Sequence, residues 1–143
     1  MPGRNGIDDP AIEGESSMMD PMMVFRNSEV FADVLFEVGD RVYPGHAIVF
    51  HSYNKFFKHI IQKQLSSGSH FPLRIKLLMS VEKMEQTMSE VYNLDLQSTS
   101  SKLRFSKYLN SSFASDIILV AETESIFCHR VLLAAHSPYF HQL

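Results

Sequence analysis

Apolar and polar residues alternate along several short stretches of the chain, and this pattern predicts strands. Val34–Val38 and Arg41–Tyr43 are apolar runs separated by a Gly-Asp pair, as in a β-hairpin. Leu73–Leu77 alternates apolar with basic residues, as a half-buried third strand would. Asp116–Ala121 and Ile126–Cys128 repeat the hairpin pattern later in the chain. The sequence therefore predicts two β-hairpins, the first with an added strand.

Apolar residues at three- and four-residue steps predict helices between these strands. One helical face runs from Ala47 to Leu65, and a second follows Ser80, a candidate N-cap. Shorter helices are expected around Phe105–Leu109 and from Val131 onward. The mixture predicts an α+β fold, a small sheet beside a helical cluster. The side chains expected in its core are Phe56, Phe57, Ile60, Met84 and Met88.

Composition limits the kind of protein that this chain can be. Its 143 residues, 45% apolar and 20% charged, suit a soluble chain with one modest core. Thirteen basic against sixteen acidic residues give a net charge of -3, which argues against nucleic acid as a partner. A single cysteine excludes an internal disulfide and a cysteine-rich metal site. A membrane span needs about 18 consecutive apolar residues, and no stretch of the sequence is that long. We therefore expect no membrane partner, and a cytoplasmic or nuclear location.

The chain also contains an internal repeat. Residues 27–60 match residues 110–143 at a constant offset of 83 positions, without a gap. Apolar positions of the two stretches coincide, and both predict the same order of strand, turn, strand and helix. The identical pairs are Asn27/Asn110, Ser28/Ser111, Asp33/Asp116, His46/His129 and Phe57/Phe140.

The second stretch resembles the front half of a BTB/POZ domain. An Asp opens the strand at Asp116, a His follows thirteen residues later at His129, and an apolar helix leads to Ser137-Pro138-Tyr139-Phe140. The first stretch resembles the same domain in degenerate form, with Asn54-Lys55 in place of Ser-Pro. Its likeness extends through Leu73–Leu77 and the helix that ends at Tyr92-Asn93. The resemblance implies a fragment of a tandem BTB/POZ protein in which the second copy is truncated.

This resemblance divides the chain into four parts. Residues 1–23 are expected to form a flexible tail, and residues 24–97 a degenerate BTB/POZ-like domain. Residues 98–112 form a linker with a short helix, and residues 113–143 the opening part of a second domain. The methionines from Met18 to Met23 fit either the start of the tail or a helix exchanged between BTB dimers.

The histidines at the strand-to-helix junctions are the first candidate site residues. His46 and His129 could bind a metal or carry a proton, but no converging Cys, His or carboxylate set accompanies them. We therefore expect them to fasten strand to helix by hydrogen bonds. Cys128 and His129 are adjacent on an expected strand, so their side chains point to opposite faces and do not form a nucleophile–base pair. We expect no catalytic residue, no metal and no cofactor; the chain is not expected to be an enzyme.

Asp116 and Arg130 form the second candidate. In BTB domains of the transcription-factor type, residues at similar positions line a charged pocket near the dimer interface, and the resemblance implies such a pocket here. A bidentate ion pair would serve it, and a purely structural pair is the alternative. In the first copy Ala47 takes the place of the arginine opposite Asp33, so that pocket would be incomplete.

The resemblance implies a protein–protein interaction module. It would act as a dimerising adaptor or scaffold that binds a BTB-containing protein, either itself or another chain. A substrate adaptor for cullin-based ubiquitin ligases is one form of this role. However, residues 62–69 lack the Glu that the apolar-x-Glu cullin motif requires, so cullin binding should be weak. The alternative is a regulatory or assembly module of a larger signalling protein, unconnected to ubiquitin.

Overall fold

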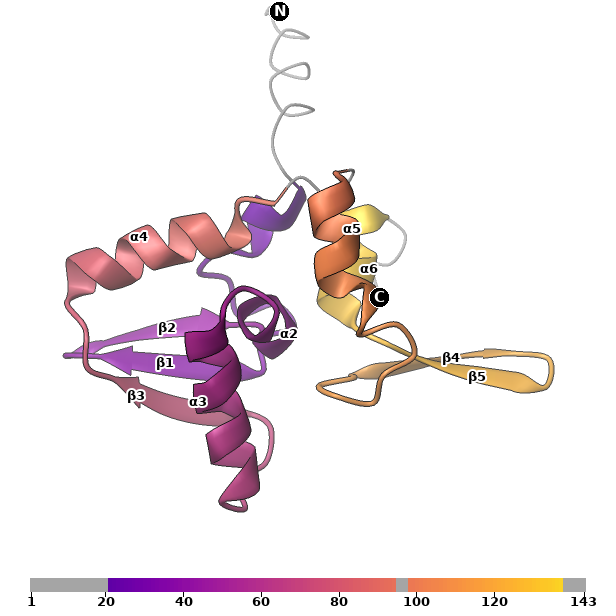
Figure 1. Ribbon diagram of the computed structural model, residues 1–143, viewed down its shortest axis with the longest axis horizontal. Coiled ribbons are helices and arrows are strands. Elements are labelled where there is room, and N and C mark those ends of the chain that lie inside the picture. The colour runs from indigo at the N-terminus through magenta and orange to yellow at the C-terminus, as the bar shows by residue number, and fades with distance from the viewer. Residues whose placement is uncertain (1–20, 95–97, 138–143) are drawn as a thin grey trace, which may run out of the picture.

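The structure, a computed structural model, describes residues 21–94 and 98–137. It is α+β, as the sequence predicts, and Figure 1 shows its arrangement. We refer to residues 21–94 as the first unit and to residues 99–137 as the second unit. In chain order the elements are η1 (Pro21–Phe25), β1 (Val34–Val38), β2 (Arg41–Gly45), α2 (Ala47–His51), α3 (Lys55–Ser66), β3 (Leu73–Leu77), α4 (Val81–Tyr92), α5 (Thr99–Ser106), β4 (Ile117–Ala121), β5 (Glu124–Cys128) and α6 (Arg130–His136).

The first unit is built on a three-stranded sheet with the order β2-β1-β3. β1 pairs antiparallel with β2 through a tight turn in which Gly39 has a φ of +61°. β3 lies parallel to β1, with Val34 opposite Leu73, because the helices α2 and α3 carry the chain back to the start of the sheet. The inward residues of β1 and β3 are buried, which confirms both the hairpin and the third strand.

The helical stretch expected from Ala47 to Leu65 is divided into α2 and α3. Asn54 has an extended backbone, with a φ of -154°, and its side chain accepts a hydrogen bond from the amide of Phe57. Asparagine bonds to nearby backbone groups more readily than it continues a helix, so it begins a new one. Phe57 is buried, but Phe56 is 51% exposed, so the expectation that Phe56 belongs to the core is wrong.

Two elements complete the core of the first unit. α4 begins after Ser80, whose side chain accepts from the amide of Lys83 as the predicted N-cap, and it buries Met84, Met88, Val91 and Tyr92. η1 places Met22 and Phe25 in the same core. Residues 21–23, which the sequence assigns to the tail, are therefore part of the fold. Residues 1–20 lie outside the described residues.

The second unit consists of α5, a two-stranded hairpin and α6. β4 and β5 pair antiparallel, with Ile117 opposite Cys128, and the hairpin projects away from the rest of the molecule (Figure 1). α6 ends at His136, and the amide of Ser137 bonds to the carbonyl of Leu133. Pro138 and Phe140 of the Ser137-Pro138-Tyr139-Phe140 sequence lie outside the described residues. Within the described stretches, no helix has the length and apolar character needed to cross a bilayer.

Candidate functional site

Two aspartates hold the starts of two helices in the same way. Oδ1 of Asp33 accepts a hydrogen bond from the amide of Ala47 at 2.7 Å, at the first residue of α2. Oδ1 of Asp116 accepts one from the amide of Arg130 at 2.7 Å, at the first residue of α6. The first amides of a helix lack partners within it, so a carboxylate placed there satisfies one of them. Each aspartate thus ties the start of a strand to the helix that follows the hairpin.

Two buried histidines fasten the same junctions. Nε2 of His46 donates to the carbonyl of Val30 at 2.7 Å, and Nε2 of His129 donates to the carbonyl of Phe113, also at 2.7 Å. In the first unit, Tyr92 donates its hydroxyl proton to Nδ1 of His46 at 2.7 Å and accepts the amide of His46 at 3.1 Å. Burial lowers the pKa of His46, so the ring is neutral. No metal-binding group of His, Cys, Asp and Glu occurs in the described part of the chain.

The backbone turns recur at the same offset of 83 positions. Among the residues that the structure describes, five non-glycine residues have a positive φ, which is uncommon for residues with a side chain. Four of them form the pairs Asn27/Asn110 and Phe31/Ala114, and the fifth, Glu122, matches Gly39. The two hairpins also have the same register along their whole length. The local backbone geometry of residues 27–50 is thus repeated in residues 110–133.

The expected bidentate pair between Asp116 and Arg130 is not formed. Asp116 bonds to the backbone amide of Arg130, while the guanidinium of Arg130 lies over the ring of Phe31, 5.7 Å from its centroid. The reason is the position of Arg130 as the first helical residue, whose free amide is the nearest donor to the carboxylate. Because this bond needs only a backbone amide, Asp33 makes the same bond to Ala47 without an arginine.

The second unit contacts the first through Arg104 of α5. Arg104 donates to Oγ of Ser52 at 2.7 Å and to the carbonyl of Val49 at 2.5 Å. Burial lowers the pKa of this guanidinium to about 10, which leaves it charged at neutral pH. For the basic residues Lys102, Arg104 and Lys107 the sequence predicts a solvated helix face. The structure shows instead that Arg104 anchors α5 at the end of α2.

His51 is the neighbouring contact between the units. Gln62 donates to Nε2 of His51 at 2.9 Å, so Nδ1 carries the proton and donates to the hydroxyl of Tyr108 at 2.5 Å. The ring also lies 4.3 Å from the ring of Phe113, measured between centroids. Burial lowers the pKa of His51 to about 4, and the nearby charges of Lys58 and Lys107 act in the same direction. The imidazole is therefore a neutral part of a packed contact.

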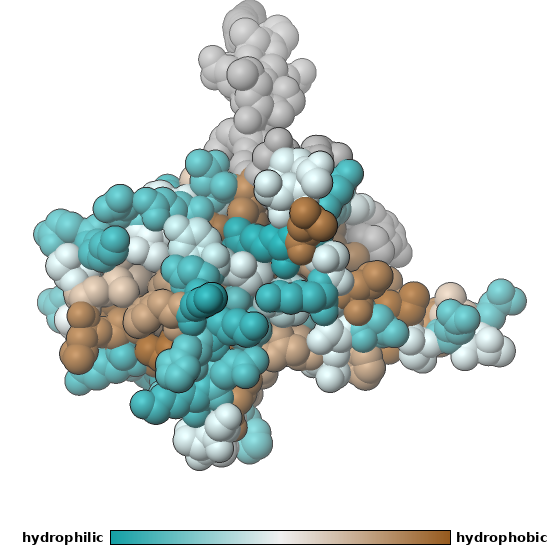
Figure 2. Space-filling view, viewed as in Figure 1, coloured by the Kyte–Doolittle hydropathy of each residue, from teal (hydrophilic) through white to brown (hydrophobic). Residues whose placement is uncertain are grey.

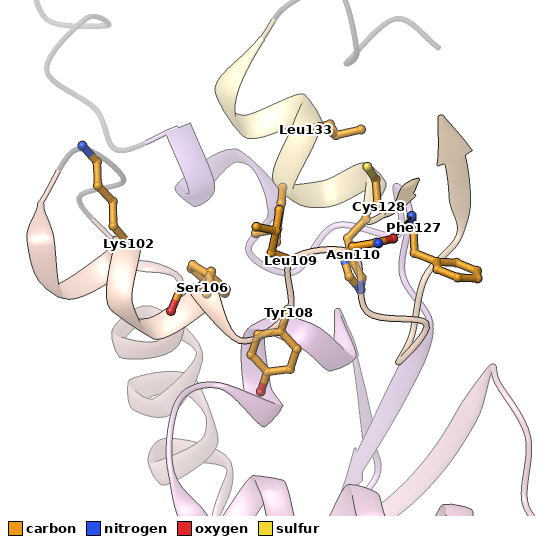
Figure 3. Close-up of a pocket in the computed structure, with 11 residues that line it drawn as sticks. Lys102, Ser106, Tyr108, Leu109, Asn110, Phe127, Cys128 and Leu133 are labelled. Atoms are coloured by element: carbon orange, nitrogen blue, oxygen red, sulfur yellow. Dashed lines mark hydrogen bonds between the residues drawn. The ribbon is translucent and has the colours of Figure 1, made fainter. Parts of the chain in front are cut away.

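The hairpin of the second unit presents apolar side chains to solvent. Ile118 and Phe127 face each other across the strands, and Val120 lies on the same face; they are 52%, 39% and 73% exposed. We call these three residues the hairpin face. In Figure 2 apolar atoms gather on the part of the hairpin nearest the body, whereas its tip is polar. Phe127 also borders a cavity of about 300 Å³ between the hairpin, α5 and α6 (Figure 3).

The side chains that line the cavity are poorly suited to catalysis. Its walls are mainly apolar, and burial raises the pKa of the Cys128 thiol there, which makes the sulfur a poor nucleophile at neutral pH. Asn110, at its edge, accepts the amide of Phe127 at 2.9 Å and so holds the hairpin (Figure 3). The cavity and the hairpin face are thus suited to binding an apolar surface. Among the lining residues are Phe105, Leu109, Phe127, Cys128, Leu132 and Leu133.

Comparison with known families finds one similarity, in the C-terminal part of the chain. The family model of the BTB/POZ domain matches residues 105–143, a stretch that includes β4, β5 and α6. BTB/POZ domains mediate protein–protein interactions, including self-association. No curated protein and no solved structure matches the chain.

Proposed function

We propose that the chain is a protein-interaction module, a dimerising adaptor or scaffold built from a degenerate BTB/POZ-like domain and the opening part of a second BTB/POZ domain. Residues 113–143 are the clearer copy, and residues 24–97 are the degenerate copy. The repeated aspartate, histidine and positive-φ positions support the duplication. Asn54-Lys55 and Ala47, which replace the Ser-Pro and arginine of the second copy, support the degeneracy of the first.

The observation that carries the binding role is the exposed hairpin face. In the first unit the matching residues of β1 are Leu35 and Glu37, and both are half-buried. In the second unit they are Ile118 and Val120, both apolar and both exposed. A grouped apolar surface in water is unfavourable by about 25 cal/mol per Å², and such surfaces usually mark a site where another protein binds. We propose that a BTB-containing chain, either a second copy or another protein, covers this face.

A pair of lysine substitutions tests this role. Ile118→Lys combined with Val120→Lys places two charges on the hairpin face, which should abolish binding because a buried unpaired charge is strongly unfavourable. Val42→Lys is the matched control, since Val42 is 47% exposed on the corresponding face of the first hairpin. The measurement is the molecular mass by light scattering over a range of concentrations, alone and with a purified BTB/POZ domain. An original chain that stays monomeric and binds no such domain would refute the proposal.

A role as substrate adaptor for cullin-based ligases has weaker support. α3 is followed by Ser67 and Gly68, and no Glu follows Leu65 at the position where the cullin motif would place it. We therefore expect weak or no binding of a cullin N-terminal domain to the full chain. Calorimetric titration measures this directly, and a tight complex would show that the chain recruits cullin through a different surface.

A further inference from the structure

The two units contact each other through matching parts of their surfaces. The offset of 83 positions relates residues 27–60 to residues 110–143, so α6 corresponds to α2. Continued toward the N-terminus, the same offset places the segment 104–108 at the position of η1. Arg104 and Tyr108 bond to α2 of the first unit. In the reciprocal position, η1 of the first unit packs against α6 of the second. The segment 104–108 of the second unit therefore contacts α2 of the first, and η1 of the first unit contacts α6 of the second.

The residues between these contacts agree with this exchange. His51 meets Tyr108, and the matching pair is Ala134 with Phe25, both of which are buried where α6 and η1 meet. Asp33 and Asp116 match each other and lie near each other, because Asp116 bonds to the amide of Arg130, whose guanidinium lies over Phe31, two residues before Asp33. Burial raises the pKa of Asp33 to about 6, and the charge of Asp116 adds to this increase. A residue that lies near its own counterpart marks a two-fold axis, as in an isologous dimer.

We infer that the two units pair with each other inside one chain about an approximate two-fold axis, as two subunits of a symmetric dimer would. The inference rests on the proposed duplication. It assigns a partner to the surface formed by η1 and α2 of the first unit, and that partner is the second unit of the same chain. A short connection gives the units an effective concentration on the order of mM for each other. A second chain at lower concentration cannot compete for the surface of η1 and α2, so external binding is left to the hairpin face.

Differences between the units favour this pairing over the pairing of identical units. If two first units paired, His51 would meet Phe25 and lose the hydroxyl that Tyr108 provides. Pro21 would stand in the place of Arg104, and the carbonyl of Val49 would lose its side-chain donor. A buried polar group without its partner costs about 1–3 kcal/mol. The interface thus selects one first unit and one second unit, which a single chain supplies.

Cross-linking of the full chain tests the pairing. Ser52→Cys and Lys107→Cys, in a Cys128→Ser background, place two thiols on either side of the contact between Arg104 and α2. Lys107 lies three residues after Arg104, close enough to α2 to affect His51. A short bis-maleimide should link them rapidly within one chain. When isotopically light and heavy chains are mixed, the product should have the monomer mass and no mixed species should form.

The control pair is Lys83→Cys with Glu122→Cys, in the same background. Lys83 lies near the start of α4, and Glu122 lies at the tip of the hairpin. Because α4 and the hairpin extend to opposite sides of the molecule (Figure 1), these two thiols should be far apart. Mixed-isotope products from the first pair, or cross-linking no faster than in the control, would overturn the inference. Adding Ile118→Lys and Val120→Lys should leave the intramolecular link unchanged, so failure of the hairpin face as a binding site is a separate outcome.

Discussion

Residues 27–50 of the first unit and residues 110–133 of the second repeat the same turns and hairpin register but differ in the elements that cover them. Val34, Phe36 and Val38 of β1 are buried beneath the helices of the first unit, whereas the matching Ile117 and Leu119 of β4 are only half-buried. The turns, the register and the aspartate and histidine bonds are nevertheless the same in both. Local sequence therefore suffices to set the path of the hairpin and the helix after it. Burial depends on elements more distant in the sequence, here β3, α3 and α4.

Truncation of matched strand residues gives the largest expected difference between the units. Phe36→Ala removes a fully buried ring and should cost about 3–5 kcal/mol of unfolding free energy. Leu119→Ala, at the matching position, should cost about 1 kcal/mol because the side chain is already half in water. Urea unfolding of the two variants measures both. Equal losses would mean that β4 is as well covered as β1.

Removal of the anchor between the units should have an intermediate effect. Arg104→Met keeps much of the apolar stem but leaves the carbonyl of Val49 and the hydroxyl of Ser52 without this donor, at a cost of about 2 kcal/mol. Arg26→Met is the matched control, since Arg26 bonds to Ser89 on an exposed surface and should contribute little. Amide hydrogen exchange in α6 should be faster in Arg104→Met than in the original chain, and unchanged in Arg26→Met. Unchanged exchange would place the anchor outside the pairing of the units.

Acid should weaken the contact between His51 and Tyr108, because His51 can take up a proton. The corresponding contact of Ala134 should not change with pH, because alanine has no titratable side chain. The folded pKa of His51 is about 4, below its ordinary value of 6.5, so the unfolded chain binds more protons between these values. Stability is thus fully present above pH 6.5 and falls as the pH drops toward 4, by on the order of 1 kcal/mol.

A variant isolates this contribution. His51→Gln should show a shallower loss of unfolding free energy between pH 7 and pH 5 than the original chain, as measured by urea titrations at each pH. His59→Gln, at an exposed position of α3, is the control and should keep the original pH dependence. If both variants behave alike, proton uptake at His51 does not drive the acid effect.

Much of the fold follows from local patterns, and the sequence predicts those parts. The two hairpins, β3, α4 and its Ser80 cap depend on residues a few positions apart. The separation of α2 from α3 was missed, although Asn54, an N-cap residue type, was a usable signal. The sequence also favoured the structural role of His46 and His129, and the structure shows their bonds.

The contacts between the units were beyond the reach of pattern analysis. The role of Arg104 was predicted from its neighbours in the sequence, and the role of Arg130 from family resemblance. The groups that their side chains contact lie in the first unit. Nothing in the local sequence says that Arg130 faces Phe31 or that Asp33 lies near Asp116. These placements depend on how two folded units dock, which is set by the shape of both surfaces together.

The charged tip of the second hairpin opposes aggregation through the exposed strands β4 and β5. Glu122 adopts a φ of +53° where the first hairpin has Gly39, a conformation that costs about 1 kcal/mol for a residue with a side chain. Glu122 and Glu124 also place two carboxylates beside an open apolar ribbon. Ribbons of this kind tend to stack into aggregates, and like charges at the edge oppose that stacking. Replacement of both glutamates by glutamine should therefore lower the solubility of the chain while leaving its folding intact.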